Sequence, residues 1–313
     1  ASKVTVSAPA QTASASGIAQ VKHAAAAAET VHDDGIHRFT ISYTKLKAVK
    51  ETKNDFKGKT FLISMDSSGF TEKISERIKK HGGKIFTLGG AGADCTADMT
   101  DPVSVEKAVT AFAKEHGDIN SFIHLSPIDY ALNGTFAAEK CIESSIKSFF
   151  MIMKNLHEIL RKKESIVAAL SFNSVVFPYG EGRGEIYPVF AGVAGMLKTI
   201  NKEFKNATVK AIDFSTDDPG KDMEQTADIF IKELLSGDRR VEVGYRDGER
   251  FGLQLKDESA VKGESLITDG STLAVTGGAG GITFEILSRM AKDFRNLKLI
   301  VLDRIDIDSV EKE

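Results

Sequence analysis

The chain alternates between two kinds of hydrophobic pattern from residue 57 to residue 256. Short, nearly continuous apolar runs, which are typical of strands buried on both faces, occur at residues 59–64, 84–88, 121–126, 165–171 and 208–215. The stretches between them carry apolar residues at helical spacing. Strands that alternate with amphipathic helices predict an α/β fold with a Rossmann-like, doubly wound parallel sheet.

The predicted helices are bounded by residues that favour helix ends. Asp101 is placed as an N-cap with Pro102 at the first helical position, and this helix should stop at Gly117. Residues 141–160 predict one long helix with Ile142 among its inward-facing residues. Further helices are expected at residues 70–83, 190–204 and 226–237. One or two strands are expected near residues 37–46, and a pair of strands at residues 239–256.

A second strand–helix–strand pattern follows a polar stretch near the end of the chain. Residues 272–276 are apolar, a glycine-rich turn follows, and a helix leads to an apolar strand at residues 298–303. A glycine-rich turn between a strand and a helix is typical of a site for phosphate groups. The patterns predict a linker at 1–36, one complete domain at 37–256, a linker at 257–271, and the start of a second Rossmann unit at 272–313.

Composition and charge exclude several classes of protein. The 313 residues carry a formal charge of −3, with 41 Lys and Arg against 44 Asp and Glu, so nucleic acid is not an expected partner. No stretch approaches the roughly 20 apolar residues of a membrane span, so no membrane association is expected. Cys95 and Cys141 give neither a disulfide framework nor metal-ligand spacing. We therefore expect no metal and a reduced, cytoplasmic setting.

Residues 1–36 are rich in Ala and Ser and lack the basic start and apolar core of a secretory signal. We interpret them as a linker between domains, with an artificial terminal tail as the alternative.

The first turn of the complete domain differs from the glycine-rich turn near the end. Its sequence is "SMDSSGFTEK", with a single glycine, Gly69. The negative charge of Asp66 would oppose a phosphate group. A purely structural turn is expected here.

Two stretches of this domain resemble short-chain dehydrogenases/reductases. Residues 95–127 resemble the middle of that fold, but the strand that ends in Asn-Asn-Ala-Gly in the family ends here in "HLSP". We expect His124, in this element, to be a hydrogen-bonded core residue rather than an acid or base.

Residues 165–204 resemble the segment that carries the family's catalytic serine and its Tyr-x-x-x-Lys motif. Ser171 or Ser174 matches the serine and Tyr187 the tyrosine, whereas Ala191 stands where the lysine should be. In the family that lysine lowers the pKa of the tyrosine, so the resemblance implies no catalytic residue in this chain.

The order of the two units resembles the ketoreductase region of modular polyketide synthases and bacterial polyunsaturated fatty acid synthases. The match is carried by "RRVEVGYRDGERFGLQL" at 239–255, "FAGVAGMLKTINKEF" at 190–204 and "TLAVTGGAGGIT" at 272–283. In that family a non-catalytic structural subdomain precedes the catalytic subdomain. The resemblance therefore implies the structural half of a β-ketoacyl-carrier-protein reductase, followed by the first β-α-β of its catalytic half.

The same resemblance implies a cofactor, a set of site residues and partners. The cofactor is NADPH, bound by the complete enzyme rather than by this chain alone. Asp303 matches the acidic residue by which NAD-specific relatives bind a ribose hydroxyl, whereas Arg304 matches the arginine that contacts the 2′-phosphate of NADPH. The partners are an acyl carrier protein, a β-ketoacyl thioester and the downstream catalytic subdomain. The implied cofactor-binding residues are Thr276, Gly277, Gly278, Ala279, Gly280, Gly281, Ile282, Asp303 and Arg304.

Two other hypotheses remain open on the sequence. One is a self-standing, atypical short-chain reductase that uses Tyr187 and Ser174. The other is a non-enzymatic scaffold that binds only a carrier protein.

Overall fold

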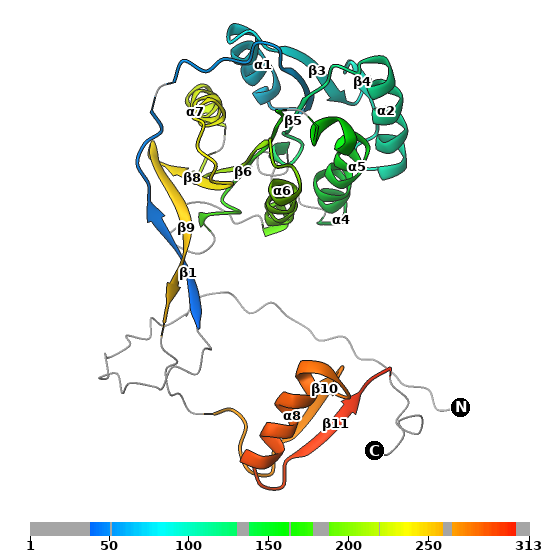
Figure 1. Cartoon of the computed structure of the whole chain (residues 1–313), viewed down its shortest axis with the longest axis vertical. Helices are drawn as coiled ribbons and strands as arrows, with labels where there is room; N and C mark the ends of the chain where they lie inside the picture. Colours follow the sequence, from blue (N-terminus) through cyan, green and yellow to red (C-terminus); the bar gives the residue numbers. More distant parts are fainter. Residues whose placement is uncertain are drawn as a thin grey trace. The chain divides into compact units, whose positions relative to one another are not determined.

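A nine-stranded sheet forms the larger part of the structure. The computed structural model describes residues 38–50, 52–129, 138–162, 164–177, 188–218, 220–258 and 265–304. The strand order is β1-β9-β8-β7-β6-β5-β2-β3-β4 (Figure 1). The strands are β1 Phe39–Lys45, β2 Thr60–Ser64, β3 Lys84–Gly89, β4 Cys95–Thr96, β5 Ser121–His124, β6 Ile166–Phe172, β7 Thr208–Phe214, β8 Glu242–Arg246 and β9 Glu249–Asp257.

Strands β2 to β8 are parallel to one another, whereas β9 is antiparallel to both β8 and β1. The predicted α/β class with a Rossmann-like, mostly parallel sheet is confirmed. The strand order reverses at β2, which has β3 on one side and β5 on the other. Folds of this class bind ligands at the carboxyl ends of the strands beside such a reversal.

Helices cover both faces of the sheet (Figure 1). Helices α1 (Phe70–Lys80) and α7 (Met223–Leu235) pack against one face, and α2 (Pro102–Glu115), α5 (Ser148–Leu160) and α6 (Ala191–Glu203) against the other. Each face has its own core of fully buried aromatic and aliphatic side chains. This burial on both sides explains why the parallel strands are nearly continuous apolar runs.

Two local sequence features shape the fold, and the first of them, at Asp101 and Pro102, was predicted. The Asp101 side chain accepts a hydrogen bond from the Val103 amide at 3.0 Å, and Pro102 is the first residue of α2. Strands β8 and β9 are joined by Asp247 and Gly248, with φ of 53° and 75°. Positive φ at both residues is what a tight two-residue hairpin turn requires.

The helix expected at residues 141–160 is present, but its first part is π-helical and not α-helical. A short helix α4 (Ala138–Cys141) leads into a π-helical segment (Ile142–Lys147), and only then does α5 begin. The wider i→i+5 turn changes the direction in which the side chains point from the helix axis. Ile142, expected to face inward, is consequently 38% exposed.

The second unit consists of β10 (Thr272–Thr276), α8 (Gly281–Asp293) and β11 (Lys298–Leu302). Its two strands are parallel, which confirms a partial second Rossmann β-α-β unit. Much of its apolar surface is exposed, including Ile282 at 81% and Leu302 at 59%. Parallel strands normally need cover on both faces, which two strands and one helix do not supply.

Among the described residues, no helix is both long enough and apolar enough to cross a membrane. The expected linker at 1–36 lies outside the described residues.

Candidate cofactor-binding site

The turn between β10 and α8 is shaped by three glycines. Gly277 and Gly281 have φ of +68° and +59°, in the left-handed region that other residues rarely adopt. A Cβ on Gly278 would lie 2.9 Å from Val301 Cγ1, so this glycine lets the turn pack closely on β11. The Gly277 amide donates to the Leu302 carbonyl at 2.8 Å, which fixes the start of the turn to the neighbouring strand.

The amino end of α8 presents backbone amides without a side-chain cap. Gly280 is the N-cap residue and has no side chain to accept from them. Within the described part of the chain, no acceptor is found for the amides of Gly281, Ile282 and Thr283. Such amides, with the positive end of the helix dipole, bind anions. The geometry therefore fits a phosphate or pyrophosphate group.

Asp303 and Arg304 lie at the end of β11, next to this turn. Asp303 Oδ2 accepts a hydrogen bond from the Ala279 amide at 2.9 Å, and Oδ1 accepts from the Arg304 amide at 2.7 Å. The structure thus brings the carboxylate against the glycine-rich turn, and the Arg304 side chain is exposed beside it. A carboxylate suits a ribose hydroxyl and a guanidinium suits a 2′-phosphate, so both chemistries are present at one strand end.

The corresponding turn of the first unit is closed by a carboxylate. Asp66 Oδ1 accepts from the Thr71 amide at 2.7 Å and from the Thr71 hydroxyl at 2.6 Å. Asp66 Oδ2 accepts from the amides of Ser68 at 2.9 Å and Phe70 at 3.2 Å. The Asp66 side chain is buried, so it occupies the amino end of α1 where an external anion would bind.

A second carboxylate reinforces this closure. Asp129 Oδ1 accepts hydrogen bonds from the Ser67 amide at 2.6 Å and the Ser67 hydroxyl at 2.8 Å. Burial, with a smaller contribution from the charge of Asp66, raises the pKa of Asp129. The amides of the first turn are thus bound by the protein's own side chains.

His124 is a hydrogen-bonded core residue, as predicted. Its Nε2 lies 2.8 Å from the Ser145 carbonyl, and its Nδ1 lies 2.9 Å from Ser64 Oγ. Ser64 Oγ in turn accepts from the Leu125 amide at 2.8 Å. Full burial lowers the pKa of His124 to about 4, so the ring is neutral at physiological pH. The π-helical segment presents the Ser145 carbonyl that binds it.

The two serines considered for catalysis bind a buried carboxylate. The Ser171 hydroxyl donates to Asp213 Oδ1 at 2.9 Å, and the Ser174 hydroxyl lies 3.4 Å from the same atom. Asp213 Oδ2 also accepts from the amides of Val175 and Val176, both at 3.0 Å. Burial raises the pKa of Asp213. Both serines are themselves buried, and they hold the segment after β6 in place.

Tyr187 lies outside the described residues. Ala191, at the position expected for a lysine, is the first residue of α6.

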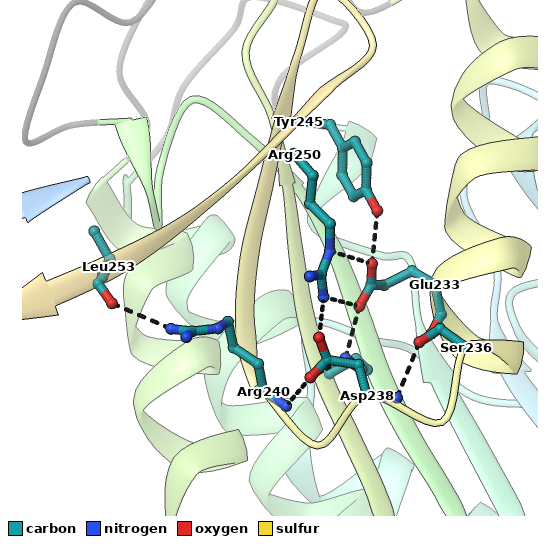
Figure 2. A network of polar contacts seen from close by, with 8 residues as sticks. Glu233, Ser236, Asp238, Arg240, Tyr245, Arg250 and Leu253 are labelled. Carbon is teal, nitrogen blue, oxygen red and sulfur yellow. Dashed lines mark hydrogen bonds and ion pairs between the residues drawn. The ribbon is translucent and has the colours of Figure 1, made fainter. Parts of the chain in front are cut away.

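Figure 2 shows a buried polar network that the sequence analysis missed. Glu233, on α7, is fully buried and accepts from Lys210 Nζ at 2.7 Å, from Arg250 Nε at 2.9 Å and from the Tyr245 hydroxyl at 2.6 Å. Arg250 Nη2 also donates to Asp238 Oδ2 at 2.7 Å. Two cations and two carboxylates therefore balance inside the fold.

Protonation in this network follows from its contacts. Burial alone would raise the pKa of Glu233, but the bonds from Arg250 and the charge of Lys210 lower it, so it is ionised. Burial and the charge of Glu233 raise the pKa of Tyr245, which stays protonated and donates its hydrogen bond to Glu233.

The sequence contained one signal for this buried network. Glu233 stands three residues after Phe230, on the apolar face of the predicted helix.

The described residues contain no group of three or more His, Cys, Asp or Glu side chains that could hold a metal ion.

No protein-family model matches the chain. It is 25% identical over 157 residues to the polyketide synthase PksN of Bacillus subtilis (strain 168), covering 49% of the chain but 3% of PksN. It is also 25% identical over 168 residues to the 3-oxoacyl-[acyl-carrier-protein] reductase FabG of Escherichia coli (strain K12), covering 48% of the chain and 68% of FabG.

Solved structures of ketoreductases have the same fold. A multidomain structure of a keto acid-selecting NRPS module, with adenylation, ketoreductase and pseudo Asub parts, aligns with a TM-score of 0.64 and 14% identity over 88% of this chain and 23% of its own. An N-terminal ketoreductase from the macrolactin assembly line aligns at 0.58 and 18% identity, over 86% and 54% of the two chains. A C2-type ketoreductase from a modular polyketide synthase aligns at 0.56 and 14%, over 86% and 58%.

The chain thus spans about half the length of these two ketoreductases. Its fold is that of ketoreductases from polyketide and NRPS modules, and its sequence is similar to PksN and to the short-chain reductase FabG.

Proposed function

We propose that this chain is the structural half of an NADPH-dependent β-ketoacyl reductase in a multidomain synthase, followed by the first β-α-β unit of the catalytic half. The observation that carries the proposal is the contrast between the two strand-to-helix turns. In the first, Asp66 and Asp129 bind the turn amides. In the second, the amides that start α8 lack an acceptor among the described residues.

The residues proposed to hold the cofactor are the glycine-rich turn, Asp303 and Arg304. The amides at the start of α8 would bind the pyrophosphate, and Gly277 and Gly281 would keep the backbone free of side chains there. NADPH would supply the hydride that converts a β-ketoacyl thioester to a β-hydroxyacyl thioester. The thioester would be carried by an acyl carrier protein, and the catalytic residues would follow Glu313.

The proposal is tested by an NADPH oxidation assay with a β-ketoacyl thioester. We expect the purified chain alone to give no turnover, and the longest natural protein that contains it to reduce the thioester. Turnover by the chain alone, abolished by Tyr187→Phe, would instead support a self-standing reductase. A natural protein that contained this chain without a downstream Ser and a Tyr-x-x-x-Asn/Lys motif would overturn the proposal.

A single variant separates the reductase from a carrier-binding scaffold. Gly281→Asp places a carboxylate in the second turn, as Asp66 does in the first, and aspartate tolerates positive φ better than most residues. In the longest natural protein, NADPH affinity should fall about 100-fold, equivalent to about 2.7 kcal/mol. Gly90→Asp, at an open position after β3, is the matched control. A protein that shows no saturable NADPH binding before mutation would be a scaffold.

A further inference from the structure

A basic hollow of about 760 Å³ lies beside the buried network, at the amino-terminal edge of the sheet. It is formed by the segment that follows β1 and by the loop between α7 and β8. Among the described residues, one carboxylate, Asp238, lines it. The cations that line it are Lys47, Lys50, Arg239, Arg240 and Arg250.

Four of these cations are not neutralised by a carboxylate among the described residues. Lys47 and Lys50 are exposed and form no ion pair there. The side chain of Arg239 donates to the Lys205 carbonyl at 3.1 Å, and that of Arg240 to the Leu253 carbonyl at 3.3 Å (Figure 2). Arg250, in contrast, is buried and bound by Glu233 and Asp238. The hollow therefore carries a positive charge that its own carboxylate does not balance.

Two neighbouring hollows also have more cations than carboxylates among their described lining residues. One of about 450 Å³ shares Arg239 and adds Lys59 and Lys205, and the carboxylates Asp55 and Glu164 also line it. Another of about 250 Å³ shares Arg240 and adds Lys202, together with Lys198 and the carboxylate Glu242, which form an ion pair. Because the cations are spread along adjoining hollows instead of converging on one point, they suit an extended ligand better than a single phosphate group.

The opposite edge of the same sheet has the opposite charge. A hollow of about 500 Å³ lies at the carboxyl ends of β7 and β8. Its described lining has one cation, Lys221, and four carboxylates, Asp217, Asp218, Asp222 and Asp247. The net charge of the chain is only −3, so the basic edge is a local feature of the folded surface. A surface of this kind steers and orients a partner of opposite charge.

The lining of the basic surface also indicates the kind of anionic partner. Leu46 and Val49 lie in the first hollow, and Val241 and Leu253 in the adjoining one, so aliphatic side chains accompany the cations. The described residues that line the first hollow include no aromatic side chain on which nucleic-acid bases could stack. We propose that this surface, at the amino-terminal edge of the sheet, binds an acidic amphipathic helix of a protein partner. The proposal does not depend on the proposed function.

A labelled peptide provides the test. The probe is an amphipathic peptide of about 18 residues, or five helical turns, with Glu on one face and Leu on the other. A second peptide has Gln in place of each Glu. Binding to the full chain is followed by fluorescence anisotropy at low and high salt. We expect the Glu peptide to bind, the Gln peptide not to bind, and affinity to fall with salt.

Two double variants locate the surface. Lys47→Glu with Lys50→Glu should weaken binding about tenfold, because two attractive contacts become repulsive. Lys107→Glu with Lys114→Glu makes the same charge change on exposed positions of α2 and should leave affinity unchanged. Neither pair removes a described contact, so the melting temperature should stay constant for both.

Several results would overturn the proposal. Equal losses in the two double variants would mean that only overall charge matters. Tighter binding of a single-stranded oligonucleotide would identify a nucleic-acid surface, and displacement of the peptide by equimolar inorganic phosphate a small-anion site. Self-association of the chain that Lys47→Glu with Lys50→Glu abolishes would assign the surface to a second copy. Absence of any binding of the Glu peptide would also refute it.

Discussion

The two strand-to-helix turns of this chain share a topology and differ in what meets their backbone amides. Between β2 and α1, the carboxylate of Asp66 accepts hydrogen bonds from three backbone amides and from the Thr71 hydroxyl. Between β10 and α8, the N-cap is Gly280, which has no side chain. A helix amino end needs acceptors from some source, either its own chain, water or a ligand. The first turn contains that acceptor, whereas the described residues supply none at the second turn.

The difference extends beyond the turns. Around the first unit, the groups that could serve a cofactor or substrate are bound to one another, as His124 is to Ser64 and Ser171 is to Asp213. The second unit exposes its apolar residues instead. The same βαβ architecture can thus have its polar groups hydrogen-bonded to one another, or it can leave the amides at a helix start without an acceptor. The polar residue types at a few positions decide which.

The largest expected effect tests whether the first unit depends on its internal polar pairs. Glu233→Ala leaves Lys210 and Arg250 buried with Asp238 as their remaining carboxylate. We expect the free energy of unfolding, measured by urea denaturation, to fall by about 3–5 kcal/mol. Glu249→Ala, which removes an exposed ion pair with Lys45, should cost about 0.5 kcal/mol or less. Similar losses of unfolding free energy in the two variants would contradict the view that buried polar pairs stabilise the nine-stranded unit.

Acid should destabilise the first unit through His124. Its pKa is about 4 in the folded protein and about 6.5 in the unfolded chain, so the unfolded chain binds the proton first. The neutral His124 ring therefore contributes fully to the free energy of unfolding above pH 6.5. About 3 kcal/mol of that free energy is lost as the pH falls toward 4. The unfolding free energy of His124→Asn should change less over this range. An NMR titration of the His124 ring near pH 6.5 would disprove this.

The Asp66 carboxylate in the first turn should contribute somewhat less to the free energy of unfolding than the two features above. Asp66→Ala leaves the amides of Ser68, Phe70 and Thr71 without their acceptor, and we expect a loss of about 2 kcal/mol in denaturant unfolding. Asp66→Asn keeps an acceptor oxygen and should lose less. If Asp66→Ala were as stable as the wild type, the contrast between the two turns would lose its energetic basis.

The smallest effect concerns what the two turns have in common. Gly69 and Gly277 both have positive φ, and a Cβ at either would meet no atom closer than 3.9 Å. Changing either residue to Ala should therefore cost only backbone strain, about 1 kcal/mol. Amide hydrogen exchange in β2 and in β10 measures the stability of the unit that contains each strand. Gly90→Ala, which has an open neighbourhood and no positive φ, should be neutral.

The sequence was sufficient where structure depends on local periodicity. Consecutive apolar residues predicted five of the parallel strands, and Asp101 with Pro102 predicted the start of α2. It failed where hydrogen bonding changes the helical period, as in the π-helical segment at Ile142–Lys147. The strand β4 (Cys95–Thr96) was also missed, because two residues carry no periodicity.

The sequence by itself determined the α/β class, the glycine-rich turn at residues 277–281 and the absence of a similar turn after β2. Only the tertiary structure decided that Asp129 binds the Ser67 amide of the first turn and that Asp303 lies against the second turn. It also decided that Glu233 joins Lys210, Arg250 and Tyr245. Local patterns are set by neighbours in the chain, whereas these contacts join residues that lie far apart in the sequence and meet only when the strands pair.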